Sequence, residues 1–313
     1  MIRRIPFANR CHRCGILLLT TAAALMTPVA ARATGPACAG RWDATITVGA
    51  RHSPAWFEIS GDETEPAMRL QLSAGPPQAV HPILTPDGGL AFFSSALGGQ
   101  VTGAFSGDSF AGSAPPQGAD TLHLSAVRAP DLPDGPVTWG KPVKLFDGHS
   151  LAGWIGRWGR DSSWAVRHGE LASVRGNDDL VTTEHYMNFK LHLKYRLQEY
   201  QDSGVHLRGR YEIQISNRED MAGPAGHPGA IYGYEAPLAD AQLPTGKWNT
   251  LEVELVGSRL TARLNGKLIH DHTRLAGITG DALDSNEGEP GPIMLQGHVG
   301  LVEFRDIVIT PAR

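Results

Sequence analysis

The chain has 313 residues and a formal net charge of −4, from 28 lysine and arginine residues against 32 aspartate and glutamate residues. Residues 1–33 hold five arginines and no acid, so the chain that follows them carries a formal charge of −9. Such an acidic chain is poorly suited to bind the phosphate backbone of a nucleic acid. Only Cys38 of the three cysteines lies beyond residue 33, which excludes an intrachain disulfide and a cysteine zinc site there.

Residues 1–33 have the pattern of a signal peptide. Arginines precede an apolar run from Gly15 to Met26, and Ala31-Arg32-Ala33 supplies the small-x-small pattern that a signal peptidase recognises. The apolar run is shorter than the ~20 residues that a transmembrane helix needs. We therefore expect cleavage after Ala33, export to the periplasm or the medium, no transmembrane segment, and no lipid anchor on Cys38.

The remaining chain is long enough for two domains, since a typical domain has about 100–150 residues. The 37 glycines and 22 prolines, with almost no helical periodicity, favour an all-β protein. We expect a small all-β meander or barrel domain over 34–130, a proline-rich linker over 131–141, and a second all-β domain over 142–313. The strands expected in the first domain are residues 42–48, 56–59, 68–72, 90–93, 101–105 and 122–127.

The second domain has clear strand and turn signals. His168-Gly169 predicts a hairpin turn within residues 163–174, and Asn265-Gly266 predicts a type I′ turn after two alternating strands. Residues 189–197 place Lys190, His192, Lys194 and Arg196 on one face, which we expect to be solvated. We expect strands at 293–298 and 301–309, and an acidic loop at 277–292 that is solvated rather than a calcium site.

Residues 201–216 combine an apolar and a polar face. Val205, Leu207, Tyr211, Ile213 and Ile215 share one parity, whereas His206, Arg208, Arg210, Glu212 and Gln214 share the other. Successive side chains of a strand point to opposite sides of its sheet, so the first set predicts core and the second a polar face. A base, two cations, a carboxylate and an amide on one face favour a functional site.

Distance decides how this stretch folds. In one straight strand, His206 and Glu212 would lie about 20 Å apart, too far to act on one substrate. A three-residue loop at Arg208-Gly209-Arg210, with Gly209 or a neighbour in the left-handed region, instead pairs Leu207 with Tyr211 and His206 with Glu212. Paired residues of two strands lie about 5 Å apart. We therefore predict a hairpin that brings His206 and Glu212 together.

Residues 142–310 contain a series of motifs in a fixed order. The motifs are Leu145-Phe146-Asp147-Gly148 with Leu151 and Trp154, Gly204-Val205 with Leu207-Arg208, Tyr211-Glu212 with Gln214-Ile215, Ile231-Tyr232-Gly233, Trp248-Asn249, Asn265-Gly266-Lys267, Leu295-Gln296 with His298, and Glu303-Phe304-Arg305-Asp306-Ile307. In this order they resemble the 3-keto-disaccharide hydrolase domain family. The resemblance implies a concanavalin-like β-sandwich, or jelly roll, of two antiparallel sheets, and activity on sugars whose C3 hydroxyl has been oxidised to a ketone.

Cleavage of such a sugar needs a base for the acidic C2 hydrogen, an electrophile for the ketone oxygen and an acid for the leaving group. We assign Glu212 as the base, His206 as its proton-transfer partner, and Arg208 as the stabiliser of the enolate. His206 and Glu212 could instead hold a divalent metal ion, and no organic cofactor is expected. The side chains expected to bind the substrate are Gln214, Gln296, His298, Tyr232 and Trp158.

Two other functions stay open. Concanavalin-like sandwiches often bind sugars without catalysis, so the chain could be a carbohydrate-binding module. An ordinary glycosidase would need a second carboxylate beside Glu212, and the alternation does not indicate one on that face. The leading hypothesis is therefore an exported enzyme that cleaves 3-keto-glycosides by elimination and hydration.

Overall fold

The computed structural model describes residues 37–313, apart from residues 63, 74, 86, 119, 175–177, 218–222 and 299. The predicted signal peptide lies outside the described residues. The described part belongs to one compact unit and contains strands and three 3₁₀-helices but no α-helix, which confirms the all-β class. The 3₁₀-helices are Ser95–Leu97, Arg157–Gly159 and Pro224–Gly226. A search of the same part finds no helix with the length and hydrophobicity needed to cross a membrane.

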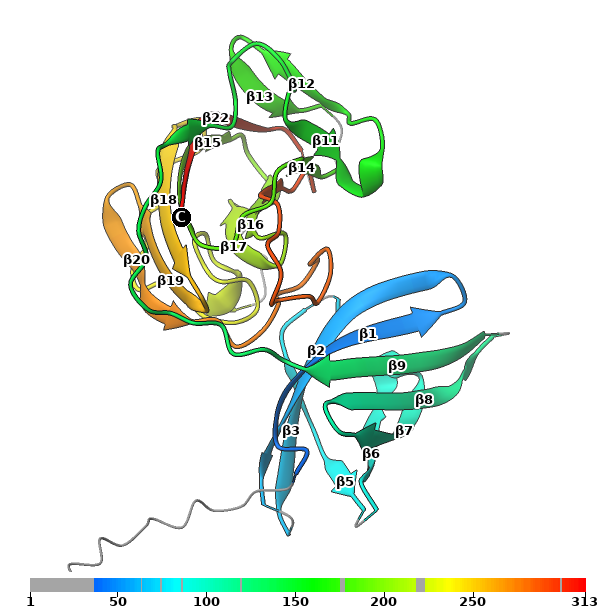
Figure 1. Cartoon of the computed structure of the whole chain (residues 1–313). Helices are drawn as coiled ribbons and strands as arrows, with labels where there is room; N and C mark the ends of the chain where they lie inside the picture. Colours follow the sequence, from blue (N-terminus) through cyan, green and yellow to red (C-terminus); the bar gives the residue numbers. More distant parts are fainter. Residues whose placement is uncertain are drawn as a thin grey trace, which may run out of the picture. The chain divides into compact units, whose positions relative to one another are not determined.

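The N-terminal strands form one antiparallel sheet in the order β4-β3-β2-β1-β9-β8-β7-β6-β5 (Figure 1). Contacts of β3 with β5 and of β4 with β6 bring its two edges together, so the sheet nearly closes into a barrel, as predicted. Trp42, Phe57 and Phe110 fill its interior. The strands are β1 Gly40–Val48, β2 Arg51–Gly61, β3 Pro66–Gln71, β4 Gln78–Val80, β5 Pro82–Leu84, β6 Gly89–Ser94, β7 Gly99–Ser106, β8 Ser109–Gln117 and β9 Asp120–Arg128.

Strand β8 has no counterpart among the strands expected from the sequence. It contains Pro115 and Pro116, which cannot donate to a hydrogen-bonded ladder, and its pairing with β9 is irregular between Ala114 and Gln117. Apolar alternation is weak where glycine, serine and alanine fill a strand. The pairing partners β7 and β9 therefore define this strand more than its own side chains do.

The C-terminal strands form two further sheets that enclose a common apolar core, which confirms the predicted sandwich (Figure 1). The larger sheet has the order β12-β13-β22-β15-β18-β19-β20, with β10 also paired to β22, and the smaller has the order β11-β14-β21-β16-β17. The strands are β10 Val143–Lys144, β11 Trp154–Gly156, β12 Trp164–Arg167, β13 Glu170–Ser173, β14 Leu180–Thr182, β15 Phe189–Leu197, β16 Asp202–Leu207, β17 Tyr211–Ser216, β18 Asn249–Val256, β19 Arg259–Leu264, β20 Lys267–Arg274, β21 Met294–Leu295 and β22 Val302–Pro311.

Local turn chemistry explains the hairpins that the sequence predicts. His168 and Gly169 have φ values of 55° and 79° between β12 and β13, and Asn265 and Gly266 have values of 52° and 79° between β19 and β20. Two consecutive left-handed residues are what a type I′ turn requires. The strand predicted at 293–298 is wrong in length, because only Met294 and Leu295 pair with neighbouring strands.

The predicted linker contains no strand but is attached to the sandwich. Arg313 donates its backbone N–H to Thr138, and Gly140 donates to Pro311. Farther back along the chain, Arg259 forms an ion pair of 2.9 Å with Asp134. The linker therefore follows the larger sheet as a fixed segment.

Candidate active site

The hairpin predicted within residues 201–216 is present. Strand β16 pairs with β17 in the register that sets His206 opposite Glu212 and Leu207 opposite Tyr211. Arg208 and Gly209 adopt left-handed φ values of 55° and 67° in the three-residue loop. At Gly209 a Cβ atom would lie 2.5 Å from Leu283, so both the conformation and the close packing require glycine.

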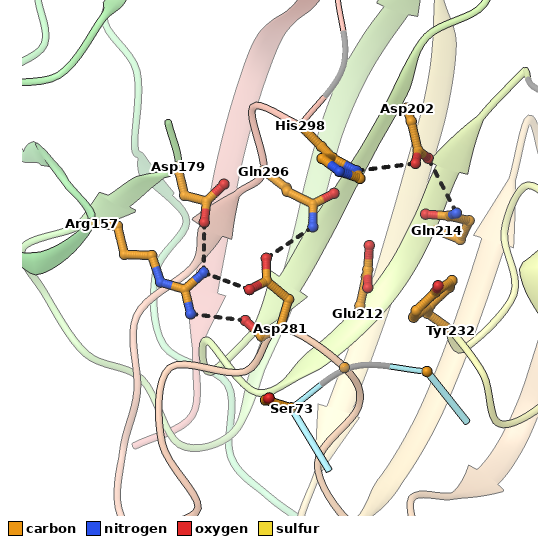
Figure 2. A pocket seen from close by; sticks show the side chains of 12 residues that line it. Ser73, Arg157, Asp179, Asp202, Glu212, Gln214, Tyr232, Asp281, Gln296 and His298 are labelled. Carbon is orange, nitrogen blue, oxygen red and sulfur yellow. Dashed lines mark hydrogen bonds and ion pairs between the residues drawn. The ribbon is translucent and has the colours of Figure 1, made fainter. Parts of the chain in front are cut away.

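The apolar parity of this hairpin is buried in the sandwich core, as expected. All five side chains of that parity belong to the main hydrophobic cluster. From the opposite face, Glu212 and Gln214 line a pocket of about 410 Å³, within the range of about 300–1,000 Å³ of small-molecule sites (Figure 2). The pocket is lined by Ser73, Gly75, Arg157, Asp179, Asp202, Glu212, Gln214, Tyr232, Gly280, Asp281, Gln296 and His298.

Glu212 lies in this pocket with 3% of its surface exposed. Burial, together with the charges of Asp281, Asp202 and Asp179, raises the pKa of Glu212 well above its ordinary value of 4.5. The carboxyl group fits against Gly204, where a Cβ atom would lie 2.2 Å from Oε1 of Glu212. Glycine in β16 therefore provides the space for a buried carboxyl group on β17.

His206 lies beside Glu212 but does not line the pocket among the described residues. Its Nε2 is 3.8 Å from Oε1 of Glu212, and the ring is fully buried. Burial lowers the pKa of His206 to about 4, against an opposing effect of the Asp281 charge, so the ring is neutral at pH 7. Neither ring nitrogen has a hydrogen-bond partner within the part of the chain that the structure describes. The buried pair therefore joins a ring that is neutral at pH 7 to a carboxyl group whose pKa is raised.

A second cluster joins three distant segments at the pocket wall. Nη1 of Arg157 donates to Oδ2 of Asp179 and Oδ1 of Asp281, each at 2.8 Å, and Nε2 of Gln296 donates to Oδ2 of Asp281 at 3.1 Å (Figure 2). Burial raises the pKa of Asp281, but the charge of Arg157, together with the hydrogen bonds from Arg157 and Gln296, opposes it, and the pKa is lowered. The pKa values of these two carboxyl groups in one pocket are therefore shifted in opposite directions.

A third cluster lies around Asp202. Oδ2 of Asp202 is 3.2 Å from Nδ1 of His298, and its Oδ1 accepts a hydrogen bond of 3.3 Å from Nε2 of Gln214. His298 has half of its side-chain surface exposed, whereas Asp202 is buried. Burial and the charges of Glu212 and Asp202 raise the pKa of Tyr232, whose side chain also lines the pocket. Gln214, Gln296, His298 and Tyr232 thus lie together, as the sequence predicts.

Arg208 and Trp158 do not lie where their predicted roles need them. The guanidinium group of Arg208 donates to Met187 O at 2.6 Å and to Gly257 O at 2.8 Å, and the residue is fully buried outside the pocket lining. The left-handed backbone of the loop turns its side chain away from the face that parity assigns to it. Trp158 is 64% exposed, and its ring lies beneath the guanidinium group of Arg157, 4.8 Å from it, rather than in the pocket.

Sequence reasoning missed Arg157, Asp179 and Asp202, which is the second acid on the polar face of the hairpin. Asp202 has the same parity as His206, so the alternation itself could have indicated it. No sequence signal connects Arg157 or Asp179 with Glu212, because these segments meet only through the ion pairs of Arg157 with Asp179 and Asp281.

The solvated acidic loop predicted at 277–292 is wrong. Besides Asp281 in the pocket, Asp284 accepts a hydrogen bond of 2.6 Å from Arg210. Buried Glu287 accepts one of 2.6 Å from the hydroxyl of Tyr211. The loop therefore packs on the hairpin through its acids.

The metal hypothesis for His206 and Glu212 does not fit the donor set. The pair offers one ring nitrogen and one carboxyl group, and no group of three or more His, Cys, Asp or Glu side chains suited to a metal ion occurs in the described ranges. A catalytic zinc site ordinarily takes three protein ligands, one more than this pair offers. We therefore derive no step of the chemistry through a metal ion.

Solved structures with a related fold come from carbohydrate-related proteins. A presumed glycosyl hydrolase from Parabacteroides distasonis ATCC 8503 has 25% identity and a TM-score of 0.48, covering 56% of this chain and 92% of its own. Another from the same organism has 24% identity and a TM-score of 0.44, covering 54% and 98%. The carbohydrate-binding module CBM66 from Bacillus subtilis has 15% identity and a TM-score of 0.35, covering 50% and 93%.

The family assignment rests on the sequence of the sandwich. A comparison with curated proteins gives no match. The family model described as the 3-keto-alpha-glucoside-1,2-lyase-like domain matches residues 141–310, or 170 of 313 residues, and these include the hairpin that carries Glu212. The chain therefore belongs to the 3-keto-alpha-glucoside-1,2-lyase-like domain family and is a carbohydrate-active protein.

Proposed function

We propose that this protein cleaves 3-keto-glycosides by elimination across C1 and C2, followed by addition of water. The observation that carries the proposal is the buried carboxyl group of Glu212, with its raised pKa, in the floor of the pocket of a chain that belongs to this family. The substrate class is a sugar oxidised to a ketone at C3. A pocket of about 410 Å³ with amide, hydroxyl and carboxyl groups suits a small polar ring.

The reaction begins at C2, where the neighbouring ketone makes the hydrogen acidic. A base removes the C2 proton, and the electron pair of the broken bond forms the enolate of the C3 ketone. The enolate then collapses to a C1–C2 double bond and expels the glycosidic oxygen, which takes up a proton. Water adds its hydroxyl to C1 and a proton to C2, so that the sum of the steps is hydrolysis.

Glu212 is the base in this proposal. A carboxylate with a raised pKa is a stronger base than an ordinary one, and proton transfer is most efficient when the catalytic pKa lies near the working pH. Neutral His206, 3.8 Å away, adds no charge to compete with this transfer. Its role is to position the Glu212 carboxyl group.

His298 and Asp202 form the acid for the leaving group. Asp202 holds Nδ1 of His298 at 3.2 Å, which leaves Nε2 of this half-exposed ring free to face a bound glycoside. The second N–H groups of the amides of Gln214 and Gln296 and the hydroxyl of Tyr232 supply donors for the ketone oxygen and the sugar hydroxyls. Arg208 has no part in this scheme.

NMR analysis of products formed in deuterium oxide tests the mechanism. With a methyl 3-keto-glucoside, elimination and hydration give a 3-keto sugar with deuterium at C2, whereas direct hydrolysis keeps the C2 proton. The comparison is made at early times against the released sugar incubated without enzyme, because slow exchange also occurs in solution. Release of a fully protonated sugar would overturn the elimination mechanism.

An ordinary glycosidase is a second candidate, because the pocket holds more acids than the sequence indicates. Asp179, Asp202 and Asp281 lie in the same lining as Glu212. A protonated and an ionised carboxyl group are the pair that glycosidases use. Cleavage of unoxidised methyl glucoside, with no turnover of its 3-keto form, would favour this function. Binding of either sugar without turnover would identify a carbohydrate-binding module.

Export remains part of the proposal. The leader pattern of residues 1–33 predicts that the mature chain begins at Thr34. Expression of the full chain in a bacterium, with N-terminal sequencing of the periplasmic fraction, tests the cleavage site. A full-length cytoplasmic product would contradict it.

A further inference from the structure

The N-terminal barrel contributes directly to the pocket. Ser73 and Gly75 lie in the connection between β3 and β4, outside the residues that match the family, and both line the pocket. Figure 2 shows Ser73 at the edge of this pocket. A barrel that had no part in the site would not need to contribute residues to a pocket of the sandwich. The contacts around this connection indicate a more specific role.

The β3–β4 connection is shaped from within the barrel. Gln71 is almost fully buried, and its Nε2 donates to Leu72 O at 2.6 Å and to Gly75 O at 2.8 Å. Gly75 has a φ of 76°, and a Cβ atom there would meet nothing within 4 Å. One buried amide therefore holds the carbonyl groups of Leu72 and Gly75 beside the pocket.

This backbone holds Asp281. The carbonyl oxygen of Ser73 accepts the backbone N–H of Asp281 at 2.8 Å. Asp281 has a left-handed φ of 59°, a conformation that costs energy for a residue with a side chain. The hydrogen bond from the barrel stabilises the conformation that points the Asp281 carboxylate at Arg157 and Gln296.

Two further contacts attach the same loop on either side of Asp281. The indole N–H of buried Trp56 donates to Ile278 O at 2.9 Å, and the ring packs on Ile278 and Ala282. Arg41 forms an ion pair with Glu287. A Cβ atom at Gly277 would lie 2.4 Å from Nε1 of Trp56, so the loop approaches the barrel as closely as glycine permits.

The connection also touches the other rim of the pocket. A Cβ atom at Gly233 would lie 3.1 Å from Cα of Pro76, and one at Gly280 would lie 3.4 Å from the ring of Tyr232 and 3.6 Å from the backbone N of Gly75. Two segments of the sandwich, at Tyr232-Gly233 and at Gly280-Asp281, thus meet on one turn of the barrel.

We propose that the N-terminal barrel is a working part of the site: its β3–β4 connection forms one wall of the substrate pocket and positions Asp281 beside Glu212. Asp281 is a positioning residue, because its charge acts on the carboxyl group of Glu212 rather than on the substrate. The consequence for turnover rests on the proposed function, whereas the positioning itself does not. A sugar bound in the pocket would therefore contact residues of both the barrel and the sandwich.

Two matched tryptophan variants test the positioning. Trp56→Phe removes the indole N–H that holds Ile278, and Trp42→Phe removes an equally buried indole N–H that donates at 2.9 Å to Cys38 O within the barrel. Hydrogen exchange of the segment 278–283 should become at least about tenfold faster in Trp56→Phe, since a buried carbonyl loses its donor, and should not change in Trp42→Phe. Equal exchange in the two variants would overturn the proposal.

The pH profile of kcat/KM separates positioning from mere stability. Displacement of the Asp281 charge lets the pKa of Glu212 fall, so the rise of activity with pH should move to lower pH in Trp56→Phe and stay in place in Trp42→Phe. Faster exchange with an unmoved profile would show a structural contact only. Gln71→Met, which removes the amide that shapes the wall, gives the same readouts if Trp56→Phe does not fold.

Assays of the wild-type protein distinguish a failure of the proposed function from a failure of the proposed positioning. If it turns over no 3-keto-glycoside, that function is wrong, and the exchange comparison alone decides the positioning. Ser73→Trp tests the wall. This variant should raise KM about tenfold for glycosides with a large leaving group, and by less for the methyl glycoside. Ser60→Trp, at an exposed position of β2 outside the pocket lining, is the control. Equal KM values in both variants would exclude a wall at Ser73.

Discussion

Two polar faces of the sandwich have the same alternation in sequence and opposite electrostatics. On β15, the four basic side chains have acidic partners on neighbouring strands: Lys190 with Glu254, His192 with Glu252, Lys194 with Asp306, and Arg196 with Glu303. The first three of these pairs are open to solvent, whereas Glu303 is largely buried. On the β16–β17 hairpin, His206 and Glu212 are buried, and further acids surround them. Charge compensation and exposure, which alternation does not encode, separate a solvated face from a candidate active site.

The largest effect is expected for Glu212→Gln. The proposed base is lost, so kcat/KM for a methyl 3-keto-glucoside should fall by about 10²–10⁴-fold. Stability should not fall. Because the folded state raises the pKa of Glu212, the wild type loses stability as pH rises from the ordinary pKa through the raised one, and the variant does not. Initial rates and thermal unfolding from pH 5 to 9 measure both effects.

The control for this variant lies on the other face. Glu252→Gln removes an exposed acid beside His192 and should leave kcat/KM unchanged. Full activity of Glu212→Gln would remove Glu212 from the mechanism.

His206 should make the protein sensitive to acid. Its pKa is 6.5 in the unfolded chain and about 4 in the folded protein, so the unfolded state binds more protons between these values. About 3 kcal/mol of unfolding free energy should be lost as pH falls from 6.5 to 4. Urea unfolding of the wild type and His206→Gln, at several pH values, should show a shallower slope in the variant.

The control for the acid sensitivity of His206 is a histidine on β15. His192→Gln, at an exposed position, should retain the wild-type slope. A slope that disappears in His192→Gln instead would assign the acid sensitivity to the solvated face.

Asp281→Asn should have a smaller effect, since burial contributes more than Asp281 to the raised pKa of Glu212. Removing the negative charge lowers the pKa of Glu212, so the rise of kcat/KM with pH should move to lower pH. Asp306→Asn, beside Lys194 on the solvated face, serves as the control. An unmoved profile in Asp281→Asn would mean that the two carboxyl groups are not coupled.

The smallest effect is expected for Lys190→Ala. Lys190 and Glu254 are 3.2 Å apart with nearly half of each side chain exposed, and such pairs contribute about 0–1 kcal/mol. The free energy of unfolding should change by less than about 1 kcal/mol. Repeating the measurement with about 0.5 M salt tests whether screening weakens the pair. A loss above this range would show that the β15 face is more than a solvated surface.

The local half of the site could be predicted from the sequence. Period-two alternation and the glycine at position 209 are sufficient for the register that pairs His206 with Glu212, because both depend on residues within one turn. The same reasoning finds Gln296 and His298, although the strand that was expected to carry them ends at Leu295. Arg208 fails the same test, since a left-handed loop residue no longer follows strand parity.

The distant half of the site depends on tertiary structure. Arg157, Asp179 and Asp281 lie in three segments with no shared pattern, and they meet through ion pairs of 2.8 Å. Ser73 comes from another sheet altogether and reaches the pocket through a backbone carbonyl, which every residue type possesses. A backbone contact leaves no trace in side-chain chemistry.

The sequence by itself determined the all-β class, the hairpin, the family and the carboxyl group at its centre. These properties follow from short-range periodicity, turn residues and motif order. Only the tertiary structure decided the direction of the pKa shift of that group, because a pKa depends on burial and on charges contributed by segments far apart along the chain. It also joined the barrel to the site, since packing between sheets fixes which loops share one pocket.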